Sequence, residues 1–226
     1  MIYNNIKQGI FHERPNRFIA IVEIDGKLEK CHVKNTGRCK ELLIKGVVVY
    51  VQEASNTNRK TRYDLISVLK GDRIINMDSQ VPNRVVYDWI VEGNYFKSIT
   101  HIQREKTFGR SRFDIYLETD NKKVFIEVKG VTLEEDNTAM FPDAPTTRGV
   151  KHINELTRSI EEGYEAYVIF VIQMEGIEKF MPNDRTHPEF GDALREARDK
   201  GLNILAYDCI VKPDSITMKD EVAIDL

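Results

Sequence analysis

The sequence predicts an α/β protein, α+β in its arrangement, with a small antiparallel β-barrel followed by a mixed sheet flanked by helices. Three observations indicate this. Short β-rich runs separated by turns fill residues 1–82, and strand-like runs alternate with helix-like segments over residues 83–226. The charge changes at the same place. Through Arg84 the chain has 15 Lys and Arg against 9 Asp and Glu, and beyond it 18 against 27.

The first part contains a clear hairpin signal. Two β-rich runs, 18–24 and 28–33, flank Asp25-Gly26, which is typical of a two-residue hairpin turn. Further β-rich runs at 47–51 and 65–69 are bounded by glycines and a polar stretch. Short antiparallel strands in a basic module of this size favour a small barrel, so we expect an OB-fold over residues 1–82.

Pro82-Asn83 marks the change to the second part, and Asn83 is the expected cap of the first helix. Thr146 or Thr147 is the expected cap of the second helix, after a long loop over 131–149 that contains two prolines. The expected elements in order are a helix at 84–92, strands at 98–103, 112–117 and 124–128, a helix from 146 or 147 to about 162, a strand at 167–173, a helix at 188–200 and a strand at 202–207. This order requires a mixed sheet with helices packed on it.

Composition excludes several classes of protein. Hydrophobic content of 41% and charged content of 31% are ordinary for a globular protein. The longest apolar run, 166–172, is too short to cross a bilayer, and the first 17 residues lack the apolar core of a secretory signal. Three cysteines without Cys-x-x-Cys spacing argue against disulfides and a zinc site. We therefore expect a cytoplasmic protein that does not bind membranes.

Two acidic residues lie in otherwise apolar, β-rich runs. Asp114 follows Arg112-Phe113, and Glu127 lies within Val-Phe-Ile-Glu-Val-Lys-Gly, residues 124–130. Because side chains alternate along a strand, Glu127 and Lys129 share one face, and Asp114 can come alongside them if the two strands pair. Two carboxylates beside a lysine are typical of a Mg²⁺ or Mn²⁺ site that hydrolyses phosphodiesters. The alternative is a cross-strand ion pair between Asp114 and Lys129, with Glu127 solvated at a strand end.

The roles within such a site follow from the residue types. Asp114 and Glu127 would hold the metal, and the Val128 carbonyl could supply another oxygen. Lys129 would orient or deprotonate the attacking water, or stabilise the transition state. Glu105, upstream of the Asp114 strand, could add a carboxylate or simply be solvated.

The chain resembles a known nuclease superfamily and, more specifically, one family. The order α-β-β-β-α-β, with Asp and then Glu-x-Lys on consecutive strands, resembles the PD-(D/E)xK or restriction-endonuclease-like nucleases. Here Phe-Asp replaces the Pro-Asp of that motif. Nearly the whole chain resembles the sugar fermentation stimulation protein (SfsA) family. The segments that carry this resemblance are His32–Arg38, Ser111–Asp114, Glu127–Leu133, Phe141–Thr146, Arg148-Gly149, Lys151-His152 and Glu155-Leu156.

The family resemblance implies an N-terminal OB-like domain over 1–82, a nuclease-like domain over 83–226, and DNA as the partner. It also implies a part in transcription regulation of sugar (maltose) utilisation. Three functions remain open: a regulatory DNA-binding protein on a nuclease-like scaffold, an active Mg²⁺-dependent nuclease, and RNA binding through the OB-like domain. The oligomeric state is also open, a homodimer included.

In the first part, the candidate DNA-binding residues lie in one Gly-containing loop. Lys34 and Arg38 would contact phosphate, while Asn35 or Thr36 could bond a base or the backbone. Gly37 would permit close backbone approach. The alternative is a tight turn with incidental charge.

In the second part, the candidates lie beside the carboxylates and at a helix start. Arg112 could meet a phosphate or pair with Asp114 or Glu127. Arg148, Lys151 and His152 lie in the first turns of the helix at 146–162. Cations there oppose the helix dipole, which disfavours a purely structural role, and the helix N-terminus itself attracts anions. We therefore expect these residues to bind phosphate. Asp143, between two prolines, could close over the metal or stabilise a turn.

Overall fold

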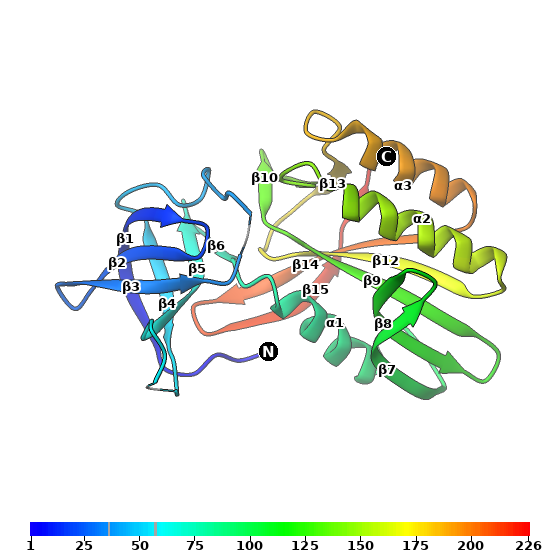
Figure 1. Ribbon diagram of the computed structural model, residues 1–226, viewed down its shortest axis with the longest axis horizontal. Helices are drawn as coiled ribbons and strands as arrows, with labels where there is room; N and C mark the ends of the chain where they lie inside the picture. Colours follow the sequence, from blue (N-terminus) through cyan, green and yellow to red (C-terminus); the bar gives the residue numbers. More distant parts are fainter. Residues whose placement is uncertain (36, 57) are drawn as a thin grey trace.

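The computed structural model describes residues 1–35, 37–56 and 58–226. Figure 1 shows a barrel of short strands on one side and a larger unit of strands and helices on the other. The barrel strands are β1 (Ile6–Asn16), β2 (Ile19–Ile24), β3 (Lys27–Val33), β4 (Val48–Glu53), β5 (Tyr63–Lys70) and β6 (Arg73–Asn76).

The barrel closes through one parallel pairing. Its strand order is β3-β2-β1-β4-β5-β6, and an additional pairing of β3 with β5 joins the two ends of the five-stranded part. The expected OB-like barrel is therefore confirmed. Strands β1 and β6 were not anticipated from the sequence. At the β2–β3 turn, Asp25 and Gly26 both have positive φ, 51° and 75°, as a two-residue hairpin requires.

The larger unit is built on a second six-stranded sheet. Its order is β15-β14-β12-β9-β8-β7, in which β9, β12 and β14 run parallel and the outer neighbours antiparallel. This is the expected mixed sheet. Its strands are β7 (Ile99–Phe108), β8 (Ser111–Thr119), β9 (Lys123–Val131), β12 (Glu165–Ile172), β14 (Asn203–Lys212) and β15 (Ser215–Glu221).

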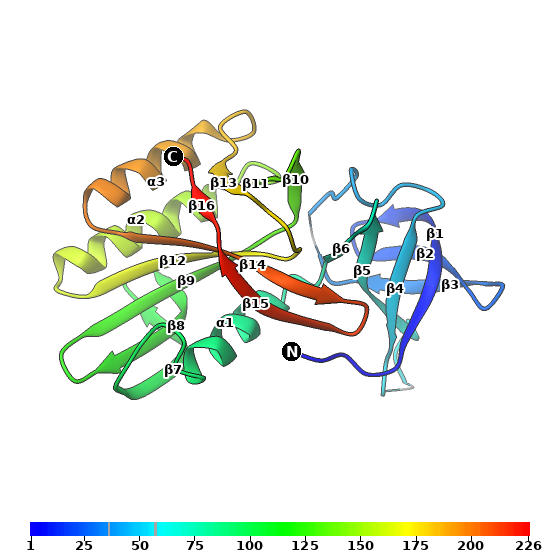
Figure 2. The same ribbon diagram turned by 180° about the vertical axis from the view of Figure 1, so that it is seen from behind.

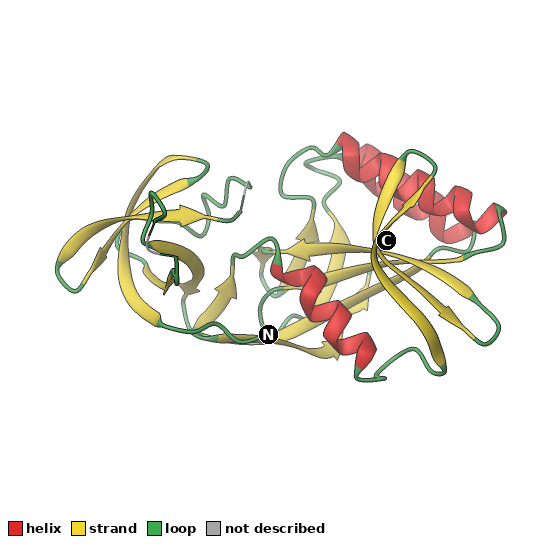
Figure 3. Cartoon of the chain, turned by 60° about the horizontal axis from the view of Figure 1, so that its bottom comes forward, coloured by secondary structure: helices red, strands yellow, loops and turns green. Residues whose placement is uncertain are grey.

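Helices cover both faces of this sheet. Helix α1 (Val81–Val91) packs on β8, β9 and β15, whereas α2 (Thr147–Glu161) packs on β8, β9 and β12 and is paired with α3 (Pro188–Asp199). Figure 3 shows α1 apart from the α2–α3 pair, with strands between them. Thr146 caps α2 by accepting a hydrogen bond from Gly149 N, as expected.

The start of α1 differs from the expectation. The cap position is Gln80, and Pro82 lies in the first turn, so Asn83 is inside the helix. Proline is well suited to the first turn because it lacks the N–H that would have no partner there. The Asn83 side chain is therefore free for another contact.

The expected loop over 131–149 also contains strands. Strands β10 (Leu133–Glu135) and β11 (Thr138–Phe141) form a hairpin, and β13 (Lys179–Pro182) and β16 (Ala223–Ile224) extend it into a small sheet. Asp136 and Asn137 turn this hairpin with positive φ. The prolines that suggested a loop, Pro142 and Pro145, follow the hairpin.

The first residues of the chain lie on the larger unit. Ile2 bridges to Ser215, and Tyr3 N donates to Asp214 O at 2.7 Å, next to the β14–β15 hairpin. Figure 2 shows this N-terminal segment beside β15 before it enters the barrel. No helix within the part of the chain that the structure describes is long and apolar enough to span a membrane.

Candidate nucleic-acid and metal site

Asp114 lies where two strands of the larger sheet diverge. Strands β8 and β9 pair from Glu118↔Lys123 to Ile115↔Ile126, and Asp114 is the next residue of β8. Its Oδ2 accepts a hydrogen bond from Val128 N at 2.8 Å, and its Oδ1 accepts one from Asn83 Nδ2 at 2.6 Å. The carboxylate thus occupies the fork between the strands, held by α1 on one side and β9 on the other.

Glu127 is buried beside this fork, with only 3% of the residue exposed. Its Oε1 accepts from Lys129 Nζ at 2.6 Å, so Glu127 and Lys129 share a face as strand alternation predicts. The same oxygen lies 2.5 Å from His152 Nδ1 on α2. Because Arg148 Nε donates to His152 Nε2 at 3.4 Å, Nδ1 is the nitrogen that carries hydrogen and donates to Glu127.

The environment of Asp114 disfavours its charge. Burial, together with the negative charge of Glu127, raises the pKa of Asp114 from 3.8 to about 6. The Val128 N–H, the charge of Lys129 and the amide of Asn83 oppose this rise without cancelling it. Two carboxylates close together repel each other unless a cation or a proton lies between them.

Glu127 behaves in the opposite way. Burial alone would raise the pKa of Glu127, but the hydrogen bond from His152 and the charge and hydrogen bond of Lys129 outweigh burial and hold it below its ordinary value. Glu127 is therefore ionised at neutral pH, and its charge disfavours ionisation of Asp114.

The donor set fits a divalent cation. Glu127 Oε2 is buried and has no hydrogen-bond partner among the described residues, so one carboxylate oxygen is available as a ligand. Within residues 1–35, 37–56 and 58–226, no group of three His, Cys, Asp or Glu side chains is arranged as a metal site. Among these residues, Asp114 and Glu127 are thus the two carboxylates of the site. That number suits Mg²⁺, which keeps several waters, better than Zn²⁺, which takes three or four protein ligands.

Of the residues of the larger unit that were predicted to bind DNA, three are exposed and one is buried. Arg112 is exposed and lies 3.6 Å from Glu105, rather than beside Asp114 or Glu127. Arg148 and Lys151 are exposed on α2, where Lys151 Nζ donates to Arg110 O at 2.8 Å. His152 is buried against Glu127 instead of facing solvent, because it lies on the inner side of α2 with Gly149, Ile153 and Leu156.

In the barrel, Arg14 organises the predicted DNA-binding loop. Its Nη1 donates to Gly37 O at 2.8 Å and to Arg38 O at 2.7 Å, and its Nη2 donates to Asn35 O at 2.7 Å. Nη2 also donates to Arg17 O at 2.8 Å. One guanidinium group therefore holds four carbonyls from two neighbouring segments.

The side chains of this loop have separate environments. Lys34 Nζ lies 3.4 Å from Asp64 and 3.3 Å from Asp78, so its charge is already paired within the protein. Arg38 is exposed. Asn35 Oδ1 accepts from Gly37 N at 2.8 Å and shapes the turn. Thr36, predicted to contact DNA, lies outside the described residues.

Gly37 brings the barrel loop against the larger unit. A Cβ on Gly37 would collide with Asp143 Oδ2 and would lie 2.9 Å from Asn35 Oδ1. A side chain at position 37 would therefore require the Asp143 carboxylate to move. A small hollow of about 160 Å³ opens at this junction, lined by residues that include Asn35, Gly37, Asp143 and Gly130, the neighbour of Lys129.

Two residues of this arrangement are not indicated by the sequence. The sequence suggests Asn83 as a helix cap, but Pro82 is typical of the first turn and indicates that the helix starts earlier. The Asn83 amide is therefore free to donate to Asp114. The Arg14 contacts span 21 to 24 residues in sequence, and no local pattern indicates them.

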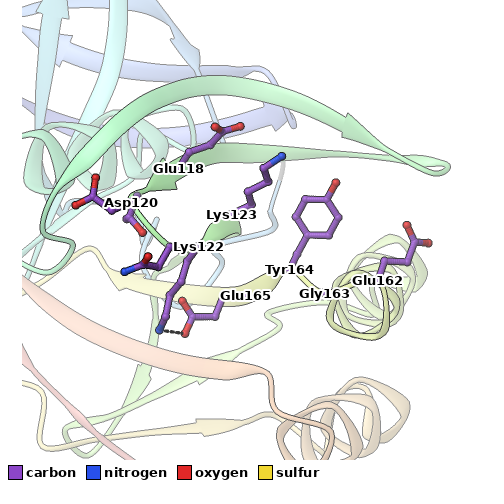
Figure 4. Close-up of a pocket in the computed structure, with 10 residues that line it drawn as sticks. Glu118, Asp120, Lys122, Lys123, Glu162, Gly163, Tyr164 and Glu165 are labelled. Atoms are coloured by element: carbon purple, nitrogen blue, oxygen red, sulfur yellow. Dashed lines mark hydrogen bonds and ion pairs between the residues drawn. The ribbon is translucent and has the colours of Figure 1, made fainter.

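A larger hollow lies away from these residues. It measures about 780 Å³ and lies at the β8–β9 turn, lined by residues 118–123 and 162–165 (Figure 4). Its charges are mixed, and Lys122 Nζ pairs with Glu165 at 2.7 Å across it. The hollow lacks the uniform positive charge of a phosphate site, and it holds no carboxylate pair available for a metal. Its size alone does not indicate a function.

Comparison with known proteins gives a consistent result over the whole chain. Residues 13–77 match the family model of the SfsA N-terminal OB domain, and residues 80–215 match that of the sugar fermentation stimulation protein RE domain. Sugar fermentation stimulation protein homologues from Ruminiclostridium cellulolyticum and Clostridium beijerinckii are 61% and 59% identical over 226 residues, each spanning 100% of both chains.

A solved structure agrees with the fold. The structure of Pyrococcus furiosus SfsA in complex with Ca²⁺ matches with a TM-score of 0.91 and 28% identity, covering 100% of this chain and 98% of that one. The resemblance found in the sequence motifs is thereby confirmed: the chain belongs to the sugar fermentation stimulation protein family.

Proposed function

We propose that the protein binds DNA, with the barrel supplying cationic contacts and the larger unit a divalent-cation site at Asp114 and Glu127. The observation that carries DNA binding is a hollow of about 280 Å³ on the barrel, lined by Arg14, Arg17, Arg38 and Lys40. Among the described residues, none that lines it is acidic. A surface of one charge sign attracts a phosphate backbone by releasing its counterions.

Mg²⁺ or Mn²⁺ is the cation that we propose for the carboxylates. The unpartnered Oε2 of Glu127 and the raised pKa of Asp114 both favour binding of a cation at this place. The Pyrococcus furiosus protein was solved in complex with Ca²⁺, and that complex, although it belongs to the relative, supports a divalent cation in this family.

The second candidate function is hydrolysis of phosphodiester bonds. It is favoured by Lys129, which lies 2.6 Å from Glu127 and so places an ammonium group at the carboxylate pair. When bound, a metal would supply an acidified water and neutralise charge on the phosphate. Lys129 would orient that water or stabilise negative charge, His152 would fix the Glu127 carboxylate, and Asn83 would fix Asp114.

One experiment separates the two functions. The purified protein is incubated with duplex, single-stranded and branched DNA, with Mg²⁺, Mn²⁺ or Ca²⁺, and both retention on DNA and cleavage are measured. Binding by the wild type supports the proposal, and its absence at low salt refutes it. Cleavage that is lost in Glu127→Gln supports the second function, whereas cleavage that survives this substitution points to a contaminant.

The regulatory role is also a proposal. The relatives are called sugar fermentation stimulation protein homologues, which supports sugar utilisation as the setting, and maltose is the sugar that we propose. Sequencing the DNA that the protein retains in cells tests it. Enrichment near genes of sugar uptake is expected, and a uniform distribution would contradict a regulatory role.

A further inference from the structure

We infer that the barrel carries a stacking platform for an unpaired DNA base, formed by Phe18 and Arg17, and that the preferred ligand is single-stranded DNA. This inference rests on the proposed DNA binding and deepens it by naming the class of DNA.

Phe18 is an exposed aromatic side chain on an otherwise polar loop. Its exposure is 46%, whereas Phe11, the other phenylalanine of the barrel, is buried at 3%. Exposure alone does not mark a binding site, because single exposed apolar side chains are common; the ordered backbone of Phe18 and the cation over its ring distinguish it. The base of a single strand is a ligand that would cover a flat apolar ring.

The backbone around Phe18 is fixed before any ligand binds. Asn16 Oδ1 accepts from Phe18 N at 2.9 Å and from Ile19 N at 3.1 Å, and Phe18 O accepts from Val33 N at 2.8 Å. Arg14 holds the preceding carbonyl, that of Arg17. A platform that is already ordered loses little conformational entropy on binding, which favours affinity.

One cation lies over this ring, and it also lines a hollow with further cations. The Arg17 guanidinium lies 4.9 Å from the centre of the Phe18 ring, and Arg17, Arg38 and Lys40 line the neighbouring hollow. None of these three forms an ion pair with an acidic side chain among the described residues, so their charges are available to phosphates. An aromatic ring for the base and cations for the backbone are the two components of single-strand binding sites on barrels of this kind.

The cationic hollow beside the platform adjoins the junction of the two units. Gly37 lines both the cationic hollow and the hollow of about 160 Å³ at the junction of the two units, and Gly130 of the second hollow directly follows Lys129. At about 30 Å³ for each water molecule, the junction hollow has room for roughly five waters or one flat ring. It is too small for a duplex, and this supports a single strand as the chain that follows this path.

The test compares Phe18 variants in a fluorescence anisotropy titration at fixed salt. The ligands are a labelled single-stranded oligonucleotide, its duplex, an RNA of the same sequence and a strand of abasic residues with the same charge. Wild type should bind the single strand more tightly than the RNA, and more tightly than the duplex, whose paired bases cannot stack on the ring. Phe18→Leu should lose about 5- to 150-fold in affinity for the single strand, the range measured for one stacked base. Phe18→Tyr should retain affinity because it retains the ring.

The abasic strand separates stacking from a structural effect. Phe18→Leu should not weaken binding of this strand, because no base is present to stack, and a structural defect would weaken both ligands alike. Leu28→Ala is the matched control, since Leu28 is 63% exposed at the far end of the same strand pair and should bind as wild type does.

The outcomes are distinguishable. Equal or tighter binding of duplex or RNA, or an unchanged affinity in Phe18→Leu, would overturn the platform while leaving DNA binding intact. Failure of the wild type to bind any of these ligands would overturn both the platform and the proposed function.

Discussion

Replacing Asp114 by Asn should stabilise the metal-free protein at neutral pH, although most changes at a buried polar residue destabilise. The reason is electrostatic. Glu127 keeps its charge, and burial next to that charge raises the pKa of Asp114 from 3.8 to about 6. Ionised Asp114 is therefore a cost to the folded state, and an amide of the same shape removes this cost.

The magnitude follows from the pKa values. A difference between 3.8 and about 6, at about 1.4 kcal/mol for each pKa unit, corresponds to about 3 kcal/mol. Since part of the side chain reaches solvent, we expect about 1–2 kcal/mol to remain. The amide can still accept from Val128 N, and Asn83 can turn its own amide to accept from the new donor.

The pH dependence has a definite sign. Below about pH 4, Asp114 is protonated in both states and contributes nothing. Between about pH 4 and 6 the folded state binds more protons than the unfolded state, so the free energy of unfolding of the wild type falls as pH rises. Above about pH 6 the full cost is present. The advantage of Asp114→Asn should therefore be absent at pH 4 and complete at pH 7.5.

Urea denaturation of metal-free wild type and variant at pH 4 and 7.5 measures this difference. Asp64→Asn is the matched control with the opposite sign: although burial raises the pKa of Asp64, Arg59 and Lys34 outweigh burial and lower it, so removing this charge should destabilise at pH 7.5. A destabilised Asp114→Asn at pH 7.5 would refute the repulsion that we assign to the carboxylate pair.

Three further predictions concern the same surfaces. Calorimetry should detect heat when Mn²⁺ is added to the wild type but not to Asp114→Ala, and equal heats would place the metal elsewhere. Lys129→Met should retain Mn²⁺ binding because lysine is not a ligand, yet lose any cleavage; a variant that still cleaves would exclude Lys129 from the chemistry. Gly37→Ala should weaken DNA binding without lowering the melting temperature by more than a few degrees, because its Cβ would meet Asp143 and displace the loop; wild-type affinity in this variant would show that the loop does not contact DNA.

Much of the fold could be predicted because its elements carry local patterns. The Asp25-Gly26 hairpin, the Thr146 cap and the apolar β12 each lie where their signals indicate. The failures have physical causes. Strands β10 and β11 are only three and four residues long, too short to show an alternation, and β11 is held by pairing with β10 on one side and β13 on the other.

The candidate site could be predicted in part. Strand alternation places Glu127 and Lys129 on one face, and in the structure Lys129 Nζ lies 2.6 Å from Glu127 Oε1. The contact of His152 with Glu127 joins residues 25 apart in sequence, and its cause is the packing of α2 on the sheet. The same holds for Asn83 and Asp114, which are 31 residues apart. Such contacts depend on tertiary packing, which no local pattern records.

The most direct test of the proposed DNA binding is the salt dependence of affinity for a single-stranded oligonucleotide. If Arg17, Arg38 and Lys40 each neutralise one phosphate, the logarithm of the association constant should fall with the logarithm of salt concentration with a slope of about −2, at roughly 0.7 for each contact. Arg38→Gln should reduce this slope by about 0.7. A wild type that does not bind at low salt, or whose affinity does not change with salt, would contradict DNA binding through this surface.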